Sequence, residues 1–143
     1  MTGQSELRIN RRARGDAARP LRHALSAFMK AKEVEPDSVD DIVTAVGEAL
    51  ANAIEHAYSD GDNGKVELFA RLDAGGTVVI EVSDQGAFIE RGQRQGRGYG
   101  LQIVRRIARW VSIDTSSGTT VSMIFDAPDA ESFRDVKAPN LER

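Results

Sequence analysis

The stretch Glu48-Ala-Leu-Ala-Asn52-Ala-Ile-Glu-His56-Ala-Tyr58 places an acid, an amide and an imidazole at intervals of four residues. Residues four apart on an α-helix are offset by only about 40°, so these groups share one face. Apolar residues recur at helical spacing on the other side, from Val39 to Ile54. The stretch therefore predicts a helix with one buried flank and one flank that offers a carboxylate and a carboxamide to a ligand. Oxygen donors of this kind suit Mg²⁺, which keeps most of its waters.

A second polar group follows a predicted strand. Thr77 to Ser83 alternate apolar and polar side chains, and the chain continues into Asp84-Gln-Gly86. An acid at a strand end followed by glycine is a frequent binding arrangement, because glycine lets another group approach the backbone. By itself, this segment is equally compatible with an ordinary turn.

A glycine-rich segment, Gly96-Arg97-Gly98-Tyr99-Gly100-Leu101, opens an amphipathic helix that continues through Ile107. Glycines at a helix start expose backbone N–H groups at the positive end of the helix dipole, which favours an anion there. The spacing differs from the dinucleotide-binding fingerprint, and no strand leads directly into it. A fourth segment, Gly118-Thr119-Thr-Val121, leads into the last predicted strand.

Composition and charge limit the class of protein. The chain has 143 residues, of which 41% are hydrophobic and 29% charged, as expected of one globular domain. It contains no cysteine, which excludes disulfides, thiol catalysis and cysteine-ligated metals. No apolar stretch has the length of a transmembrane helix, and the net charge of -3 argues against nonspecific nucleic-acid binding. We expect a cytoplasmic protein that binds neither nucleic acid nor membrane.

Hydrophobic periodicity predicts an α/β protein, in the form of an α+β two-layer sandwich. A mixed, largely antiparallel sheet would be covered on one face by about three helices. The expected strands are 6–10, 66–72, 77–83, 110–113 and 119–125, and the helices are expected to follow Asp16, Asp37 and the glycine-rich segment, with both aspartates as N-caps. We expect residues 1–126 to form one domain and residues 127–143 to form a C-terminal tail.

In this order, the four segments resemble the GHKL-type ATP-binding domain. Within that superfamily, the chain is similar to the anti-sigma-factor serine kinases of bacterial partner-switching systems. The resemblance covers roughly Leu7 to Phe125 and depends mainly on the helix motif and the glycine box. It implies a GHKL ATPase/kinase fold, ATP and Mg²⁺ as cofactors, and a homodimer. It further implies a serine/threonine kinase that phosphorylates an anti-sigma-factor antagonist and holds a sigma factor inactive, so that these two proteins are its partners.

The resemblance also implies roles for individual residues. Glu48 corresponds to the general base that acts on the attacking hydroxyl, and Asn52 to the residue that holds Mg²⁺ against the phosphates. Asp84 corresponds to the acid that accepts a hydrogen bond from the adenine amino group, with support from Gly86 and Thr119. The other positions match phosphate-binding residues of the family, and they are His56, Gly96, Arg97, Gly98, Tyr99, Gly100 and Leu101.

Two departures from the family pattern affect the nucleotide site. The Asp-x-Gly motif commonly continues into another glycine, whereas Ala87 and Phe88 follow here. The segment between Gly86 and Gly96 is short for a lid over a triphosphate. This shortness leaves room for a partner protein to complete the site.

Two other functions use the same nucleotide chemistry. The first is the catalytic domain of a sensor histidine kinase; against it, no histidine-bearing dimerisation helix precedes the motifs, and such kinases usually lack the acid at the position of Glu48. The second is a non-catalytic module that binds ATP only to set its own shape. The residues leave this alternative open, because binding and transfer use mostly the same groups.

Overall fold

The computed structural model describes residues 5–59, 64–84, 98–116 and 118–128, and for residues 56–59 and 98–101 it describes the backbone alone. The elements of this part of the chain are β1 (Glu6–Arg12), α1 (Ala18–Ala31), α2 (Pro36–Ser59), β2 (Lys65–Leu72), β3 (Thr77–Asp84), α3 (Gly98–Ile107), β4 (Trp110–Asp114) and β5 (Thr119–Asp126). No helix in the described residues is long and apolar enough to cross a membrane.

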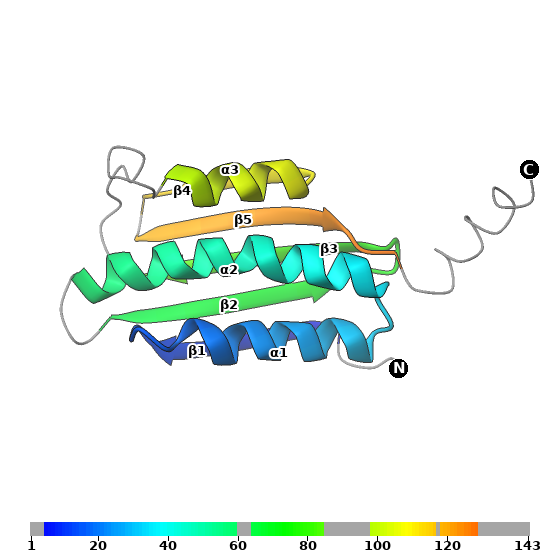
Figure 1. Ribbon diagram of the computed structural model, residues 1–143, viewed down its shortest axis with the longest axis horizontal. Coiled ribbons are helices and arrows are strands. Elements are labelled where there is room, and N and C mark those ends of the chain that lie inside the picture. Colours follow the sequence, from blue (N-terminus) through cyan, green and yellow to red (C-terminus); the bar gives the residue numbers. More distant parts are fainter. Residues whose placement is uncertain (1–4, 60–63, 85–97, 117, 129–143) are drawn as a thin grey trace, which may run out of the picture.

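The strands form one sheet in the order β1-β2-β3-β5-β4. Every neighbouring pair among the described strands is antiparallel. The three helices lie side by side over one face of this sheet, with α2 between α1 and α3 (Figure 1). The predicted fold class is therefore confirmed, although the parallel pairing that a mixed sheet implies is absent from the described strands.

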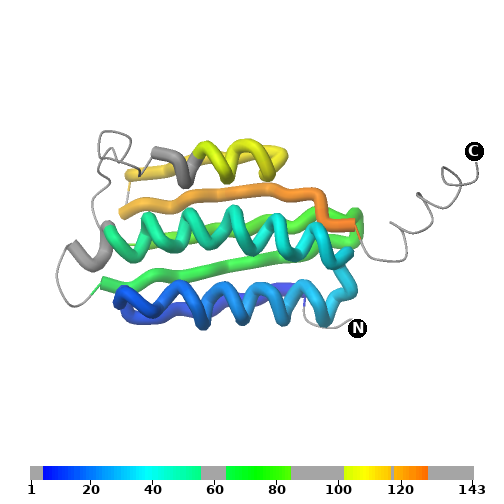
Figure 2. Tube along the Cα trace, viewed as in Figure 1, coloured from blue at the N-terminus to red at the C-terminus, as the bar shows by residue number. Residues whose placement is uncertain are grey.

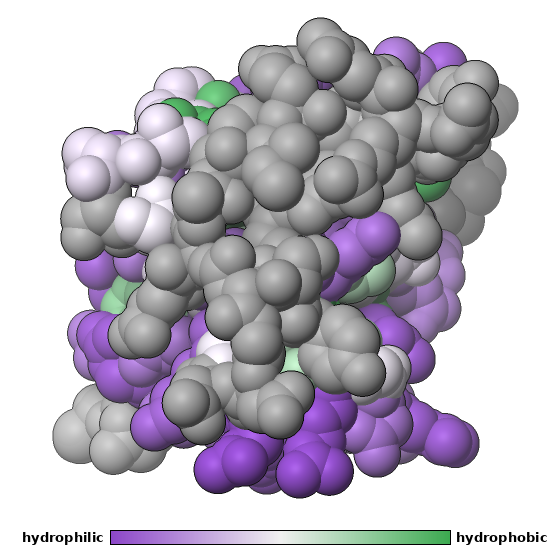
Figure 3. Space-filling model, turned by 90° about the vertical axis from the view of Figure 1, so that its left-hand side faces the viewer, coloured by the Kyte–Doolittle hydropathy of each residue, from purple (hydrophilic) through white to green (hydrophobic). Residues whose placement is uncertain are grey.

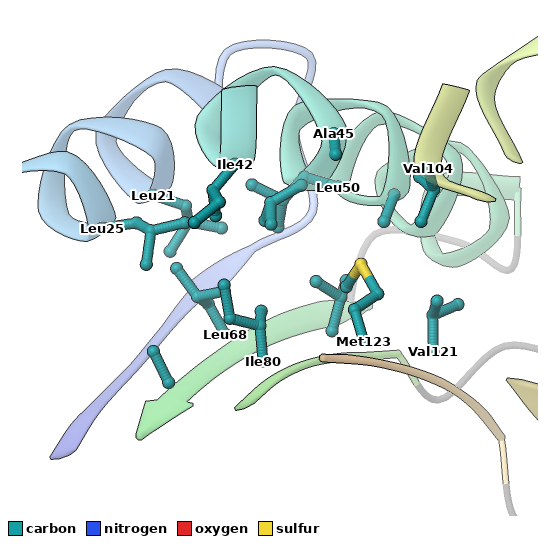
Figure 4. Packing of buried hydrophobic residues seen from close by; sticks show 14 of the residues in the cluster. Leu21, Leu25, Ile42, Ala45, Leu50, Leu68, Ile80, Val104, Val121 and Met123 are labelled. Carbon is teal, nitrogen blue, oxygen red and sulfur yellow. The ribbon is translucent and has the colours of Figure 1, made fainter. Parts of the chain in front are cut away.

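The core lies between the sheet and the helices, and the strands supply it with every second side chain. In β3 the buried positions are Val78, Ile80 and Val82, and the intervening side chains are only half-buried. The helices contribute aliphatic residues such as Leu21 and Leu50, and Figure 4 shows them facing the strand residues. Burying one such side chain stabilises the fold by about 1.5–3 kcal/mol. This face of the sheet is consequently fixed in register, since a slip by one residue would turn the apolar set outward.

The starts of α1 and α2 differ from the prediction. Asp16 does not cap α1, which follows Ala17 without any side-chain cap. At α2, the Glu35 carboxylate accepts hydrogen bonds from the Ser38 backbone N–H at 2.9 Å and from its hydroxyl at 3.1 Å. Asp37 is thus not the N-cap of α2, but lies in its first turn, near the positive end of the helix dipole.

The two ends of the molecule gather different elements. At one end, the backbone N–H of Glu35 donates to the Pro128 carbonyl at 2.9 Å, and that of Ala127 donates to the Gly76 carbonyl at 2.6 Å. These bonds join the start of α2 to the end of β5 and to the β2–β3 turn. At the other end, on the left of Figure 1, lie the end of α2, the end of β3, and the starts of β5 and α3. Figure 2 shows the same placement for the end of β3 and the start of β5.

Candidate functional site

Asp84 and Thr119 form the last residue pair between β3 and β5. They are directly opposite each other in the antiparallel ladder. Both continue the buried rows of their strands, so that only 4% of Asp84 and 3% of Thr119 is exposed. Two polar side chains from distant parts of the sequence therefore face the helix layer together, at the left-hand end of Figure 1.

The Thr119 hydroxyl is a buried polar group that lacks a hydrogen-bond partner among the described residues. Leaving such a group unsatisfied costs about 1–3 kcal/mol, so a buried orphan of this kind calls for a ligand or an ordered water. The Asp84 carboxylate on the neighbouring strand adds a hydrogen-bond acceptor beside this hydroxyl.

The turn that leads into Thr119 is held by a short hydrogen-bonded loop. Asp114, the last residue of β4, accepts hydrogen bonds from the Ser116 backbone N–H at 2.9 Å and from its hydroxyl at 2.8 Å. These two hydrogen bonds lower the pKa of the Asp114 carboxyl from its usual value, and the bond from the Ser116 backbone N–H has the larger effect. Gly118 then supplies the positive φ of 78° that brings the chain back into β5.

Glu48 and Asn52 lie one turn apart in the second half of α2, and both side chains are half-buried. Their orientation can be derived from that of Gly47 on the same helix. A Cβ added to Gly47 would lie 3.1 Å from the Cδ atom of Arg22, which belongs to α1. Gly47 therefore faces α1. Asn52 lies about 140° further around the helix, on the flank away from α1. That flank is the side on which α3 packs (Figure 1).

The donors on α2 fit one kind of metal site and not another. The described residues contain no group of three His, Cys, Asp or Glu side chains that could hold a metal ion. This excludes a zinc-type site made by protein ligands alone from the described part of the chain. A single carboxamide beside a carboxylate does fit Mg²⁺, which takes one or two protein oxygens and fills its other positions with water and phosphate.

The start of α3 supplies backbone donors at the same end of the molecule. The helix begins at Gly98, and its first turn includes the backbone of Tyr99, Gly100 and Leu101. The first four N–H groups of a helix have no intrahelical partner, and they point toward any anion placed there. Where the view of this end shows described residues, hydrophilic ones gather mostly along its lower part (Figure 3).

The structure tests the predicted site residues unequally. It brings Asp84 and Thr119 together. By helical spacing from Gly47, Asn52 lies on the flank of α2 away from α1, and Glu48 lies about 40° from it. Gly86, Gly96 and Arg97 lie outside the described residues, as does the side chain of His56.

One contact near the site was missed by sequence reasoning. The side chain of Arg22 lies against Gly47, the residue before Glu48. A glycine inside a helix costs about 1 kcal/mol relative to alanine. The position of Gly47 within the motif helix was therefore the signal that a side chain from another element lies close.

Comparison with known proteins defines the class to which this fold and site belong. Residues 12–125 match the family model of the histidine kinase-like ATPase domain. The match spans most of the chain, so the chain belongs to this family. This agrees with the resemblance that the helix motif and the glycine box indicated.

Within the family, the chain is similar to regulators of sigma factors. It is 35% identical to the anti-sigma F factor of Clostridium botulinum (strain Eklund 17B / Type B) over 69 residues, which are 48% of this chain and 48% of that protein. It is 28% identical to the serine-protein kinase RsbW of Bacillus subtilis (strain 168) over 119 residues, which cover 72% of this chain and 74% of that protein. The match to the anti-sigma F factor thus spans about half of its length.

A solved structure agrees in fold with these relatives. The crystal structure of the RsbU and RsbW domains of a Mycobacterium tuberculosis protein matches 87% of this chain and 33% of that chain, with a TM-score of 0.70 and 26% identity. The similarity therefore includes the arrangement of sheet and helices as well as the sequence motifs.

Proposed function

We propose that this chain is an ATP-dependent serine/threonine protein kinase that phosphorylates an anti-sigma-factor antagonist and acts as an anti-sigma factor. The observation that carries the proposal is the buried Asp84–Thr119 pair, which lies at the same end of the molecule as the start of α3 and the end of α2. Membership of the histidine kinase-like ATPase family and the names of the relatives support the same conclusion.

The adenine end of the site is built by β3 and β5. The Asp84 carboxylate accepts a hydrogen bond from the adenine amino group, and the Thr119 hydroxyl bonds the same base directly or through a water. Guanine carries a carbonyl where adenine carries the amino group, so its oxygen would face the carboxylate acceptor to acceptor. Gly86 follows Asp84 closely and leaves space for the base. This arrangement selects ATP over GTP.

The phosphate end of the site is built by α2 and α3. Backbone N–H groups of Gly98, Tyr99, Gly100 and Leu101 bind phosphate oxygens at the helix start. Gly96 allows the chain to approach the phosphates, and the charged or polar groups of Arg97 and His56 balance their charge. The Asn52 carboxamide holds Mg²⁺, whose chemical contribution is to neutralise and orient the phosphates.

The transfer step requires a base near the phosphates, and Glu48 is placed one turn before Asn52. Its carboxylate accepts the proton of a partner serine or threonine hydroxyl as that oxygen bonds to the γ-phosphorus. The bond between the γ-phosphorus and the bridging oxygen of ATP breaks, and ADP leaves. General-base assistance of this kind contributes about 10²- to 10⁴-fold to the rate.

Three further features belong to the same proposal. Residues 1–126 act as the kinase domain and residues 127–143 as the C-terminal tail, whose first two residues, Ala127 and Pro128, are bonded to the domain. The protein acts in the cytoplasm, where ATP and a sigma factor are available to it, and it acts as a homodimer. Partner proteins complete the nucleotide site, because the segment between Gly86 and Gly96 is short.

Phosphate transfer to a protein tests the proposal directly. Candidate antagonist proteins are incubated with the chain, ATP and Mg²⁺, and the products are analysed by mass spectrometry. We expect phosphoserine or phosphothreonine on the antagonist and none when Mg²⁺ is chelated. Phosphohistidine instead would favour the histidine-kinase alternative, and ATP binding without transfer to any antagonist that binds would leave a passive nucleotide-binding module.

A further inference from the structure

A second cross-strand pair lies one position inside the Asp84–Thr119 pair. Ser83 and Thr120 are directly opposite each other, and their hydroxyl oxygens are 3.2 Å apart. Successive side chains of a strand point to opposite faces, so this pair lies on the open face of the sheet. It is separated by the thickness of the sheet from any nucleotide held by Asp84 and Thr119.

We propose that the Ser83–Thr120 hydrogen bond is a positioning element for adenine recognition, an inference that rests on the proposed function. It holds the ends of β3 and β5 at the spacing at which Asp84 and Thr119 meet one base. Neither hydroxyl touches the nucleotide. The bond therefore acts only through Asp84, which follows Ser83 in β3, and Thr119, which precedes Thr120 in β5.

The location of the bond is the first argument for this role. Asp84 is the final residue of β3 and Thr119 the first residue of β5, so the recognition pair lies at the open end of the ladder. Strand ends separate more easily than strand centres, because backbone bonds hold them from one side only. A side-chain bond at the adjacent pair opposes this separation at the point where it would disturb the base.

The second argument is that the bond joins β3 to β5, whereas the next hydroxyl pair on the same face does not bond. Ser112 and Ser122 are also directly opposite each other, between β4 and β5. In the described part of the chain, no hydrogen bond joins their side chains. The bonded pair is thus the one that links the two strands carrying Asp84 and Thr119.

The expected effect is on base selection and not on phosphate binding. In the proposed site the phosphates are bound by α2 and α3, and neither helix carries the Ser83–Thr120 bond. Loss of the hydroxyl bond therefore weakens ATP binding through the base and leaves GTP, which gains little from Asp84, almost unchanged. The ratio of the two affinities is the specific readout.

The test measures ATP and GTP affinities by calorimetry for Thr120→Val, Ser83→Ala and the double variant. Valine preserves the shape and the strand preference of threonine while removing its hydroxyl. We expect each single variant to bind ATP about three- to tenfold more weakly, with GTP affinity unchanged. The double variant should be no weaker than either single variant, because the bond is lost once. Thr120→Ser, which keeps a hydroxyl, should restore most of the ATP affinity.

The matched control is Ser122→Ala, which removes an unbonded hydroxyl from the same face of β5. It should leave the ATP-to-GTP ratio at the wild-type value. A fall in melting temperature of the Thr120→Val or Ser83→Ala variants without a change in that ratio would overturn the positioning role while leaving the proposed function intact. Equal affinities for ATP and GTP in the unmutated protein would overturn both proposals.

Discussion

A carboxylate occupies the last inward position of β3, after three apolar side chains in the same row. Asp84 is 4% exposed, whereas Val78, Ile80 and Val82 are at most 1% exposed. Burying a carboxylate is far more costly than burying valine, so a residue that served packing alone would be apolar here. The residue type agrees with the proposed role of Asp84 in binding a ligand.

The first prediction concerns Asp84. A hydrogen bond to a charged group contributes roughly 1.5–3 kcal/mol, so Asp84→Ala should weaken ATP binding about ten- to a hundredfold. Calorimetry with ATP and GTP measures this loss, which should be much smaller for GTP. Glu81→Ala, which removes a carboxylate from the open face of the same strand, is the control and should bind both nucleotides normally. An unchanged ATP affinity in Asp84→Ala would remove this residue from the site.

The second prediction concerns Asn52. If its carboxamide oxygen holds Mg²⁺ against the phosphates, Asn52→Ala should lose most of the magnesium-dependent part of ATP affinity. The fold should survive, because the side chain is only half-buried and lies outside the apolar row of α2. Titrations with Mg²⁺ and with EDTA give the two affinities that are compared. Asp41→Ala, an exposed acid earlier on the same helix, should retain the full magnesium effect; the same effect in Asn52→Ala would contradict the metal assignment.

At the scale of the elements, the β2–β3 turn depends on one glycine. Gly76 has a φ of 85°, and its backbone N–H donates to the Asp73 carbonyl at 3.2 Å. Non-glycine residues reach this region of φ only at a cost of roughly 1–2 kcal/mol. The turn also contacts Ala127, so it helps to hold the end of β5.

The third prediction follows from this geometry. Gly76→Ala should destabilise the protein by roughly 1–2 kcal/mol, because the cost is conformational: an added Cβ would meet only ordinary contacts at 3.8 Å and beyond. Gly75→Ala is the matched control, since Gly75 has no positive φ and its Cβ would lie 3.5 Å from an Asp73 oxygen. Thermal or urea unfolding compares the two variants. Nucleotide affinity should stay unchanged in both, because the turn lies at the opposite end of β3 from Asp84. Equal free energies of unfolding of the two variants would contradict the claim that the positive φ of Gly76 makes alanine costly there.

The elements also show what local sequence signals can and cannot predict. The strands were predicted within about two residues at each end, because alternation of apolar and polar side chains depends only on which face is buried. The helix starts also lay within about two residues of the prediction, but the predicted capping residues of α1 and α2 were wrong. The side chain of Glu35 caps α2, which begins at Pro36. The backbone N–H of Glu35 is bonded to the Pro128 carbonyl, far along the chain. No pattern near Asp37 contains that contact.

At the scale of the whole molecule, the site is assembled from segments that the chain order keeps apart. Alternation alone predicts that Asp84 and Thr119 point inward, but not that β3 and β5 are neighbours, since β4 precedes β5 in the sequence. Their partnership followed from resemblance to a family and not from spacing. The hydroxyl pair on the open face was missed for the same reason, because it exists only once the strand order and register are known.

The two ends of the molecule carry different groups. One end is fixed by backbone bonds from Glu35 and Ala127 and by an ion pair of Arg109 with Asp126 at 3.4 Å, which is exposed and contributes little by itself. The other end carries the buried polar pair, the start of α3 and the acid and amide of α2. If the second end binds the nucleotide as we propose, its functional groups are held by helices and strands and not by loops alone.

Replacement of Glu48 by glutamine tests the proposed kinase activity most directly, because it separates ATP binding from phosphoryl transfer. Glutamine keeps the shape of the side chain and removes its ability to accept the proton, so Glu48→Gln should bind ATP and Mg²⁺ as the wild type does. Transfer of phosphate from ATP to a serine or threonine of an antagonist protein should slow by about 10²- to 10⁴-fold, measured under single-turnover conditions. Normal transfer by the glutamine variant, or no transfer by the wild type to any antagonist that it binds, would contradict the assignment of Glu48 as the base of a protein kinase.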